Sequence, residues 1–437
     1  MNTTSGLPSL GFSSSLSDLE DGFSWAKEIA LATVRTGSSP EAIPSYHAGL
    51  LDRPMFYSRD VAHQALGAHL LGLDEENFVM LRHFGASATE ARKYYPLWAF
   101  TFDGEPAAID YRSDTDFVRE TPAPFEIAQL ALELYRWTHD KRYLTDPALT
   151  EYYEHIVNDF VRLHDIQGLG LAGELETVDI FAGSPTYNEH AGLPDLQIAA
   201  DGVASQWAAM NTVSEVLGDC ALAKQARSEA DRVLAAFESS WWDDEGGRYL
   251  VGLSSGGQLK GFASEASWFP MVKRMPLDDR RVHRHLAQLA EWLRENPPHF
   301  LESTSYLPEA FFAYGFDDEA LYWLRRVIDS RWTYPEIPFT IISNLATGLT
   351  GLEVAADGSI STRSKLPDGE WVEVRDVPIA NALLTIRHEG RHHTELTLAG
   401  TASPLRCEAH FAGTPPQVTE LAPGSTVRLS ADRSIRR

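Results

Sequence analysis

The sequence is poor in cysteine and in basic residues, and each shortage excludes some classes of protein. Of 437 residues only two are cysteines, Cys220 and Cys407, which excludes a disulfide framework and a cysteine-based zinc site. Lysine and arginine total 37 against 62 aspartates and glutamates, so the formal net charge is −25. A phosphate-binding surface needs clustered lysine and arginine, and the chain has no such cluster. We therefore expect no nucleic-acid partner.

Long apolar runs are missing too. None approaches the roughly 18 residues that a membrane helix needs, and the first residues, MNTTSGLPSLGFSSSLSD, lack the basic and apolar segments of a secretory signal. We expect a soluble, cytoplasmic protein without a membrane partner. The 43% hydrophobic and 11% aromatic composition suits a large core and a neutral polar ligand. The oligomeric state stays open, a homo-oligomer included.

Cofactor motifs are absent or fail in context. Residues 168–173 match GxGxxG, but a helical pattern precedes them and a polar loop follows, which excludes a dinucleotide site. The sequence contains no P-loop and no HExxH. His283 and His285 lie on a polar helical face, where we expect them to be solvated. We expect no cofactor and no metal, although an ion held by loop carboxylates would leave no signal here.

Helical periodicity fills most of residues 18–350. Many of these helices are more apolar than a surface helix, which predicts burial on most sides. Long loops separate helical pairs, and long ordered loops are usually functional. We predict a mainly α fold, an (α/α)6 toroid of helical hairpins with its long loops on one side. The predicted helices are 18–34, 59–73, 74–88, 121–138, 149–165, 200–219, 221–242, 280–296, 308–316, 318–332 and one after 333–340; the loops are 90–120, 166–196 and 241–275.

The pattern changes near residue 353. Segments such as EWVEVRDVPI and HTELTLAG alternate apolar and polar residues, and DG and PG turns separate them. We predict a catalytic helical domain over residues 1–352 and a small, β-sandwich-like antiparallel domain over 353–437.

Residues 333–340, TYPEIPFT, place Glu336 between Pro335 and Pro338 just before an apolar helix. The prolines fix φ and stiffen the segment. Two interpretations are open. Glu336 complements the helix N-terminus, or it is a catalytic base held where a helix opens into a pocket.

The loop over 90–120 combines aromatic rings with carboxylates, among them Trp98, Asp103 and Glu120. Rings stack on the apolar faces of sugars, and carboxylates accept hydrogen bonds from hydroxyls. A carbohydrate pocket and a well-packed structural loop with an acidic edge explain this composition equally well.

Three further segments carry polar candidates. The loop over 166–196 holds Asp179 and the cluster Tyr187, Asn188, Glu189 and His190, which turn chemistry alone could also explain. Tyr57, Arg59 and Asp60 open a helix, where Asp60 is an N-terminal cap or a site residue. GFASEASWFP places Glu265 and Trp268 in the core or in a pocket wall.

Glycoside hydrolysis needs two carboxylates that flank the scissile bond. One is a protonated acid, and the other is a base or a nucleophile. A helical toroid supplies them from loops far apart in sequence. Glu336 and one of Glu189 or Asp179 fit this requirement.

Five segments stand in a recognisable order along the chain: FYSRDVAHQALGAHLLGLDEEN, TPAPFEIAQLALELYRWTHDKRYL, AGSPTYNEHAGLPDLQIAADGVASQWAAMNTVSEVLGD, WWDDEGGRY and TYPEIPFTIISNLATGL. Taken in order, they resemble the six-hairpin, (α/α)6-barrel glycoside hydrolases, nearest to the group of trehalases, processing α-glucosidases and mannosylglycerate hydrolases. The likeness spans roughly residues 20–350, and its motifs are specific as an ordered set rather than singly.

The resemblance implies an inverting glycosidase that acts on a small oligosaccharide or glycoside. It puts Glu336 at the base position and Glu189 or Asp179 at the acid position. The acid loop lacks the group's Asp-x-x-Pro-Arg pattern, and we prefer Glu189 because it lies nearer the next helix. The C-terminal β domain is more similar to that of rhamnosidase-type relatives, so the substrate does not transfer. The candidate substrate-binding residues are Tyr57, Arg59, Asp60, Trp98, Asp103, Arg119, Glu120, Tyr187, His190 and Trp268.

Inversion requires carboxyl groups roughly 6.5–9.5 Å apart. A Glu336 buried in an ion pair with no cleft beside it would count against this hypothesis. Two rivals remain: a sugar epimerase or polysaccharide lyase on the same toroid, with His63, His190 or Tyr187 as proton shuttle, and a non-catalytic carbohydrate-binding protein.

Overall fold

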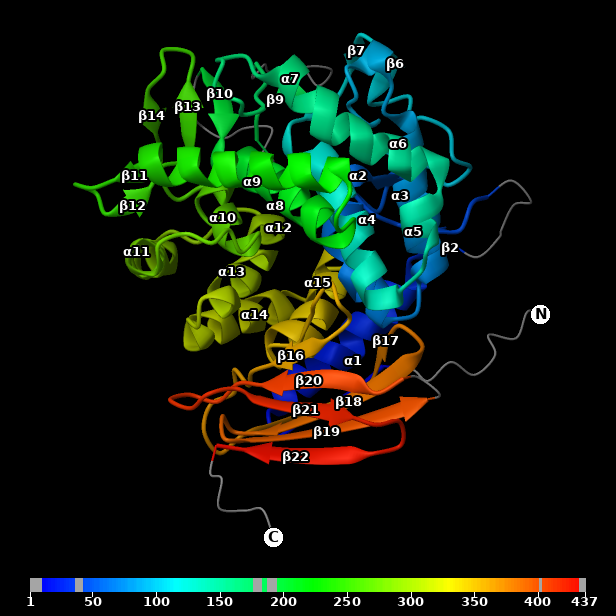
Figure 1. Cartoon of the computed structure of the whole chain (residues 1–437), viewed down its shortest axis with the longest axis vertical. Coiled ribbons are helices and arrows are strands. Elements are labelled where there is room, and N and C mark those ends of the chain that lie inside the picture. Colours follow the sequence, from blue (N-terminus) through cyan, green and yellow to red (C-terminus); the bar gives the residue numbers. More distant parts are fainter. Residues whose placement is uncertain (1–9, 36–41, 176–182, 187–194, 401–402, 432–437) are drawn as a thin grey trace.

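Helices form the body of the protein, and the longest strands gather at one end, below the helices in this view (Figure 1). The structure is a computed structural model, and it describes residues 10–35, 42–175, 183–186, 195–400 and 403–431. The helices are α1 (Ser17–Ala32), α2 (Ser58–Leu70), α3 (Asp74–Ser87), η1 (Glu90–Arg92), α4 (Pro122–Thr138), α5 (Arg142–Thr145), α6 (Pro147–His155), η2 (Ile156–Phe160), α7 (Val161–His164), α8 (Ala200–Val216), α9 (Ala221–Ser240), η3 (Glu265–Ser267), α10 (Phe269–Val272), α11 (Asp279–Glu295), α12 (Leu301–Ser305), α13 (Leu307–Ala313), α14 (Asp317–Ser330), α15 (Glu336–Ser343) and η4 (Asn344–Gly348).

The predicted helices are present, and local chemistry sets their ends. α4 begins with Pro122 in its first turn and ends at Thr138, because His139 takes a left-handed conformation with φ +54°. A proline is tolerated in a first turn, where its missing N–H has no helical partner. Every helix in the described part of the chain is too short or too polar to span a bilayer.

Burial separates an inner set of helices from an outer set. All eight residues of α15 are buried, and so is most of α8, whereas α9 and α11 bury one face and expose charged residues on the other. α2 packs against both α4 and α15, and α4 packs against α8. The core of the helical body therefore lies among the inner helices, as their apolar sequences predict.

The C-terminal strands form two sheets, with orders β1-β17-β18-β19-β22 and β15-β16-β20-β21. Side chains alternate between buried and exposed along β17, which is the pattern of a strand with one face on a core. Pairing is antiparallel except that β16 runs parallel to β20. These strands are β1 (Gly11–Ser14), β15 (Glu353–Val354), β16 (Ile360–Thr362), β17 (Trp371–Ile379), β18 (Ala382–Glu389), β19 (His393–Gly400), β20 (Leu405–Ala409), β21 (Gln417–Leu421) and β22 (Thr426–Ser430).

One edge strand comes from the other end of the chain. β1 pairs with β17, with Gly11 opposite Arg375 and Ser14 opposite Val372. The larger sheet thus includes residues that the sequence analysis assigned to the helical domain. The division at residue 352 stays a prediction.

Short strand pairs lie among the loops of the helical body, and some of them, such as β6 with β7 and β13 with β14, lie at the end away from these sheets (Figure 1). They are made of β2 (Val34–Arg35), β3 (Ser45–Tyr46), β4 (Met55–Tyr57), β5 (Ala99–Thr101), β6 (Tyr111–Ser113), β7 (Asp116–Phe117), β8 (Arg119–Glu120), β9 (Gly183–Ser184), β10 (Leu196–Ala199), β11 (Trp242–Asp243), β12 (Arg248–Tyr249), β13 (Gly252–Ser254) and β14 (Leu259–Lys260).

Candidate functional site

Three helices far apart in sequence bring carboxylates together where they begin. Asp60 lies in the first turn of α2, Glu302 in that of α12 and Glu336 in that of α15. One carboxylate oxygen from each lies within 4.8 Å of the other two. The positive end of each helix dipole favours a carboxylate at this position. We call these three residues the carboxylate cluster.

Two cationic side chains offset the negative charge of the carboxylate cluster. Arg59 binds Glu302 through Nη2 at 2.7 Å and lies 3.6 Å from Glu120 through Nη1. His63, one turn into α2, donates through Nδ1 to Glu336 and through Nε2 to Glu309, the latter at 3.0 Å. Arginine is well suited to such a position because its planar fork binds carboxylates strongly.

An aromatic ring fixes the position of His63. The ring of Tyr306 stacks on the imidazole with 3.6 Å between centroids and 7° between planes. A second tyrosine, Tyr334, donates its hydroxyl to Asp60. Both contacts hold the cluster in place.

Burial dominates the protonation chemistry here. Burial and the neighbouring Glu336 and Glu302 raise the pKa of Asp60 to about 8. Burial also raises the pKa of Glu336, against the attraction of His63. Burial alone would lower the pKa of His63, but Glu309 and Glu336 outweigh it and raise that pKa to about 9. His63 is therefore protonated at neutral pH and donates both of its N–H groups.

Other buried carboxyls lie at the starts of neighbouring elements. Burial raises the pKa of Asp201, in the first turn of α8, to about 7, and that of Glu265, at η3, to about 7. Glu265 accepts a hydrogen bond from Ser303, which neighbours Glu302. Such shifted carboxyls gather at functional sites more often than elsewhere.

The cluster offers oxygen ligands of the kind that hard cations prefer. Arg59 and His63 already place positive charge on it, and Tyr334 occupies an oxygen of Asp60. One oxygen of each carboxylate in the cluster therefore already has a partner among the described residues.

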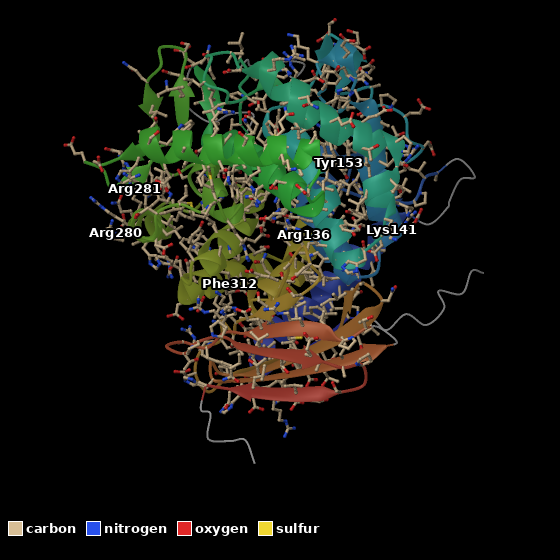
Figure 2. All side chains as sticks on the ribbon, in the orientation of Figure 1. Arg136, Lys141, Tyr153, Arg280, Arg281 and Phe312 are labelled. Carbon is tan, nitrogen blue, oxygen red and sulfur yellow. The ribbon has the colours of Figure 1, made fainter. Side chains whose placement is uncertain are left out.

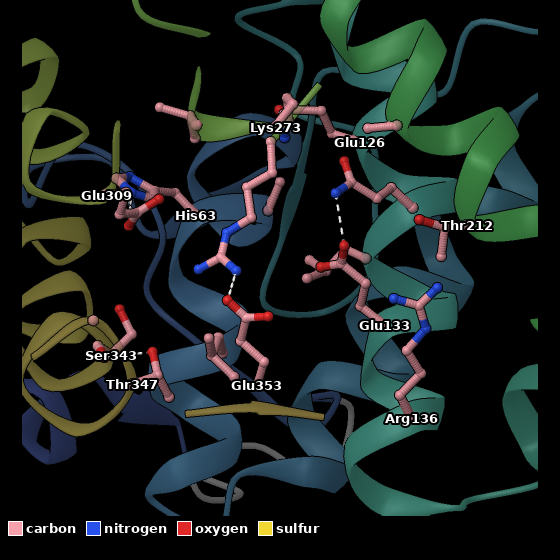
Figure 3. Close-up of a pocket in the computed structure, with 18 of the residues that line it drawn as sticks. His63, Glu126, Glu133, Arg136, Thr212, Lys273, Glu309, Ser343, Thr347 and Glu353 are labelled. Atoms are coloured by element: carbon pink, nitrogen blue, oxygen red, sulfur yellow. Dashed lines mark hydrogen bonds and ion pairs between the residues drawn. The ribbon is translucent and has the colours of Figure 1, made fainter. Parts of the chain in front are cut away.

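Glu336 is 1% exposed and ion-paired with His63. This meets the first of the two conditions that would count against Glu336 as a base, namely burial in an ion pair. The second condition is that no cleft lies beside it. A cavity of about 430 Å³ is lined by His63 and Glu309, as Figure 3 shows, but Glu336 is not part of its lining. The helix-capping interpretation and the catalytic one both agree with its place in the first turn of α15.

The structure brings several predicted residues together and separates others. Arg59, Asp60 and Glu120 lie at the cluster. Trp268 is buried next to η3. Tyr57 and Trp98 contact each other with 6.3 Å between ring centroids, within a small apolar group of their own.

Arg119 pairs with Glu174 at 2.9 Å, and Asp103 lies in the turn after β5. Four further candidates, Asp179, Tyr187, Glu189 and His190, lie outside the described residues.

The prediction that His285 is solvated is wrong, although His283 is exposed. His285 is fully buried, donates through Nε2 to the carbonyl of Ser267 at 2.7 Å and accepts from the N–H of Tyr249 at 3.1 Å. Burial lowers its pKa to about 4. It is a neutral structural histidine that sequence periodicity placed on the wrong face of α11.

Sequence reasoning missed Glu302, Glu309 and Glu126. Glu126 gave a usable signal, since it is a lone carboxylate in the apolar first half of α4. It is 2% exposed and pairs with Lys273. A charge in an apolar helix needs such a partner. Glu302 lies in the five-residue α12, which no pattern predicted, and Glu309 lies in a predicted helix whose pattern does not single out a carboxylate.

The chain matches no protein-family model and no curated protein. Among solved structures, it is similar to a rhamnosidase from a Bacillus species, at 14% identity and a TM-score of 0.61, over 93% of this chain and 43% of the other. It is also similar to a sialidase, at 10% identity and a TM-score of 0.65, over 96% and 41%.

The fold resembles that of the six-hairpin glycosidases. This confirms the resemblance that the ordered segments predicted, at the level of the fold. A mannosylglycerate hydrolase from Thermus thermophilus also matches, at 14% identity and a TM-score of 0.48, over 74% of this chain and 98% of that one. The chain spans less than half the length of the rhamnosidase and of the sialidase.

Proposed function

We propose that the protein is a glycoside hydrolase that cleaves a small oligosaccharide or glycoside with inversion. The convergence of Asp60, Glu302 and Glu336 beside Arg59 and His63 carries this proposal. In this account the inner and outer helices close into an (α/α)6 toroid, and the substrate binds where the inner helices begin. The named activities of the similar structures favour the class, and their low identity leaves the sugar open.

Glu336 is the proposed base. A raised pKa makes a carboxylate a stronger base, and protonated His63 orients it and stabilises its ionised form. The attacking water approaches from the side of Glu302, whose side chain is 21% exposed. Glu302 is consequently the competing base, and the two are told apart by their amide variants.

Glu189 is the proposed acid, with Asp179 as its competitor. Arg59, Asp60 and Glu120 bind substrate hydroxyls, and Asp60, neutral below about pH 8, both donates and accepts. Tyr57, Trp98, Asp103, Arg119, Tyr187, His190 and Trp268 stay candidates for the substrate wall. A cytoplasmic location stays a prediction, and so does any self-association.

One observation supports the epimerase and lyase alternative: His63, its candidate proton shuttle, contacts Glu336. A shuttle must accept a proton in one step and return it in another. The pKa of His63 is about 9, so it holds its proton at neutral pH. Hydrolysis therefore fits the site better.

The test is product analysis of a panel of aryl glycosides and oligosaccharides incubated in ¹⁸O-labelled water. Hydrolysis places the label on the released sugar. An epimerised sugar without label, or an unsaturated sugar, would replace the proposal with one of its rivals. Unmodified ligand that binds wild type and Glu336→Gln equally well would indicate a non-catalytic binding protein.

The same panel assigns the base. If Glu336 is the base, Glu336→Gln loses activity far more completely than Glu302→Gln does. The reverse order would transfer the role to Glu302. Arg59→Lys is the matched control for charge, since it keeps the cation but loses the bidentate fork.

A further inference from the structure

A second polar compartment lies inside the helical body, nearer the sheets than the carboxylate cluster. The cavity of about 430 Å³ is lined by parts of α2, α4, α8, α13, η4 and β15, and its volume is within the range of roughly 300–1,000 Å³ typical of ligand pockets. Arg136 on α4 and Phe312 on α13 lie in the half of the body that faces the sheets (Figure 2). His63 and its partner Glu309 form the wall toward the cluster.

Four buried polar atoms of the lining have no hydrogen-bond partner among the described residues. Three are acceptors, Oε2 of Glu126, Oε1 of Gln129 and Oδ1 of Asn344, and one is a donor, Nε of Arg136. Glu126 is 2% exposed and Asn344 is 3% exposed. Buried polar atoms are nearly always satisfied in folded proteins. The side chains that carry these atoms line the cavity, so an occupant rich in hydroxyl groups would supply three donors and one acceptor once these groups turn toward it.

The charges of the lining are balanced. Glu126 pairs with Lys273, Glu309 with His63, and Glu353 with Arg274. Glu133 accepts from Gln129 at 2.7 Å, and Arg136 reaches out of the cavity to Glu215 at 2.6 Å. An anion would meet these carboxylates, and each of the cations named here is already paired with a carboxylate, Arg136 with one outside the lining.

Apolar surface completes the lining. Trp137, Trp207 and Phe312 contribute rings between the polar groups. Rings beside a few directed polar groups are typical of pockets for compact neutral ligands. Figure 3 shows the carboxylates and Thr212 around the open volume.

We propose that this cavity is a binding site for a neutral polyhydroxy ligand the size of one monosaccharide or cyclic polyol. It is distinct from the proposed catalytic site, because His63 and Glu309 lie between the two. The proposal holds whether or not the protein is a hydrolase.

Isothermal titration calorimetry with glucose, rhamnose, myo-inositol and glucose 6-phosphate tests this site, followed by crystals soaked in the best binder. We expect one neutral compound to bind with 1:1 stoichiometry, and its ring to contact Glu126 and Asn344. Thr212→Phe places a ring in the cavity and should weaken binding at least tenfold. Ser228→Phe, on the exposed face of α9, is the matched control and should bind as wild type does.

Gln129→Met supplies a second variant in case Thr212→Phe does not fold, because it removes the acceptor at similar volume. It should weaken binding severalfold. Glu302→Gln should leave the cavity's affinity unchanged, whereas loss of binding in Glu302→Gln with retention in Thr212→Phe would place the ligand at the cluster and overturn the proposal. Tighter binding of the phosphorylated sugar, or crystals with only water in the cavity and no heat from any compound, would also overturn it.

Discussion

His63 lies between two carboxylates, Glu336 at Nδ1 and Glu309 at Nε2, with Tyr306 stacked on its ring. The imidazolium is buried, and Glu309 and Glu336 offset its charge. Because each nitrogen of this imidazolium donates to a carboxylate oxygen, neither carboxylate can move away without losing its hydrogen bond. The residue that fixes Glu336 is thus a neighbour on α2, 273 positions away in sequence.

The pKa of Asp60 makes stability depend on pH. It is about 8 in the folded protein and near 3.8 when unfolded, so the folded state binds more protons between these values. The contribution of this group to stability falls as pH rises from about 4 to about 8. His63, raised from 6.5 to about 9, adds stability below about pH 6.5 that is lost as pH rises through 9.

We therefore predict that the thermal midpoint declines between pH 6.5 and 8, and that Asp60→Asn declines less steeply. The asparagine still accepts from Tyr334 but does not titrate. Thermal unfolding followed by circular dichroism across this range measures both slopes. Equal slopes in the variant and the wild type would contradict the assigned pKa.

The acid is predicted to be Glu189. Glu189→Gln should lower kcat about 10²–10⁴-fold on a glycoside with a poor leaving group and far less on a dinitrophenyl glycoside, which needs no protonation. Asp179→Asn is the matched control and should show no dependence on the leaving group. If Asp179→Asn shows that dependence instead, the two roles exchange.

At the scale of the elements, α2 and α15 approach so closely that one position admits only glycine. A Cβ added at Gly67 would lie 2.2 Å from the carbonyl oxygen of Phe339. Backbone cannot give way as a flexible side chain can. This contact brings Asp60 and His63 on one helix beside Glu336 on the other.

Gly67→Ala should accordingly destabilise the protein by about 1–3 kcal/mol through strain between the two helices. Gly85→Ala is the control, since its Cβ would meet the side chain of Leu149 at 3.2 Å. Urea unfolding compares the two. An unchanged midpoint for Gly67→Ala would mean that the helices separate easily.

Sequence periodicity was sufficient for the long elements. α4 ends at Thr138 and β19 covers residues 393–400, as the patterns predict. β1 was missed because its partner β17 lies more than 350 residues away and four residues hold no periodic signal. For the same reason the parallel pairing of β16 with β20 could not be predicted.

The site residues also fall into those that the sequence predicted and those that it did not. Residues at the starts of predicted helices, such as Asp60 and Glu336, could be found from the sequence because helix starts have recognisable chemistry. Glu302 lies in the five-residue α12 and Glu309 in the seven-residue α13, where no pattern singles out a carboxylate. Trp98 was chosen for the aromatic composition of its loop and Tyr57 for its place at a helix start, and neither signal says what a ring packs against.

At the scale of the whole molecule, buried charges join the helical body to the sheets. Asp317 at the start of α14 is 4% exposed. It lies 3.8 Å from the ammonium of Lys365 and 3.3 Å from the guanidinium of Arg391. Lys365 also donates to the carbonyl of Phe312 at 3.0 Å. The two cations come from the strand-rich part of the chain, so the carboxylate holds both parts together.

Asp317→Asn should destabilise the protein by about 3 kcal/mol, because it leaves a buried lysine without a countercharge. Asp318→Asn, at an exposed neighbouring position of the same helix, is the matched control and should change stability by less than about 0.5 kcal/mol. Chemical denaturation of both variants measures the difference. Equal effects would show that the ion pairs contribute nothing specific.

The central claim is inverting hydrolysis with Glu336 as the base, and time-resolved ¹H NMR of the released sugar tests it most directly. The wild type should release the anomer opposite to that of the substrate before mutarotation, and Glu336→Gln should release none. Hydrolysis with retention of the anomer, or undiminished hydrolysis by Glu336→Gln, would contradict the account.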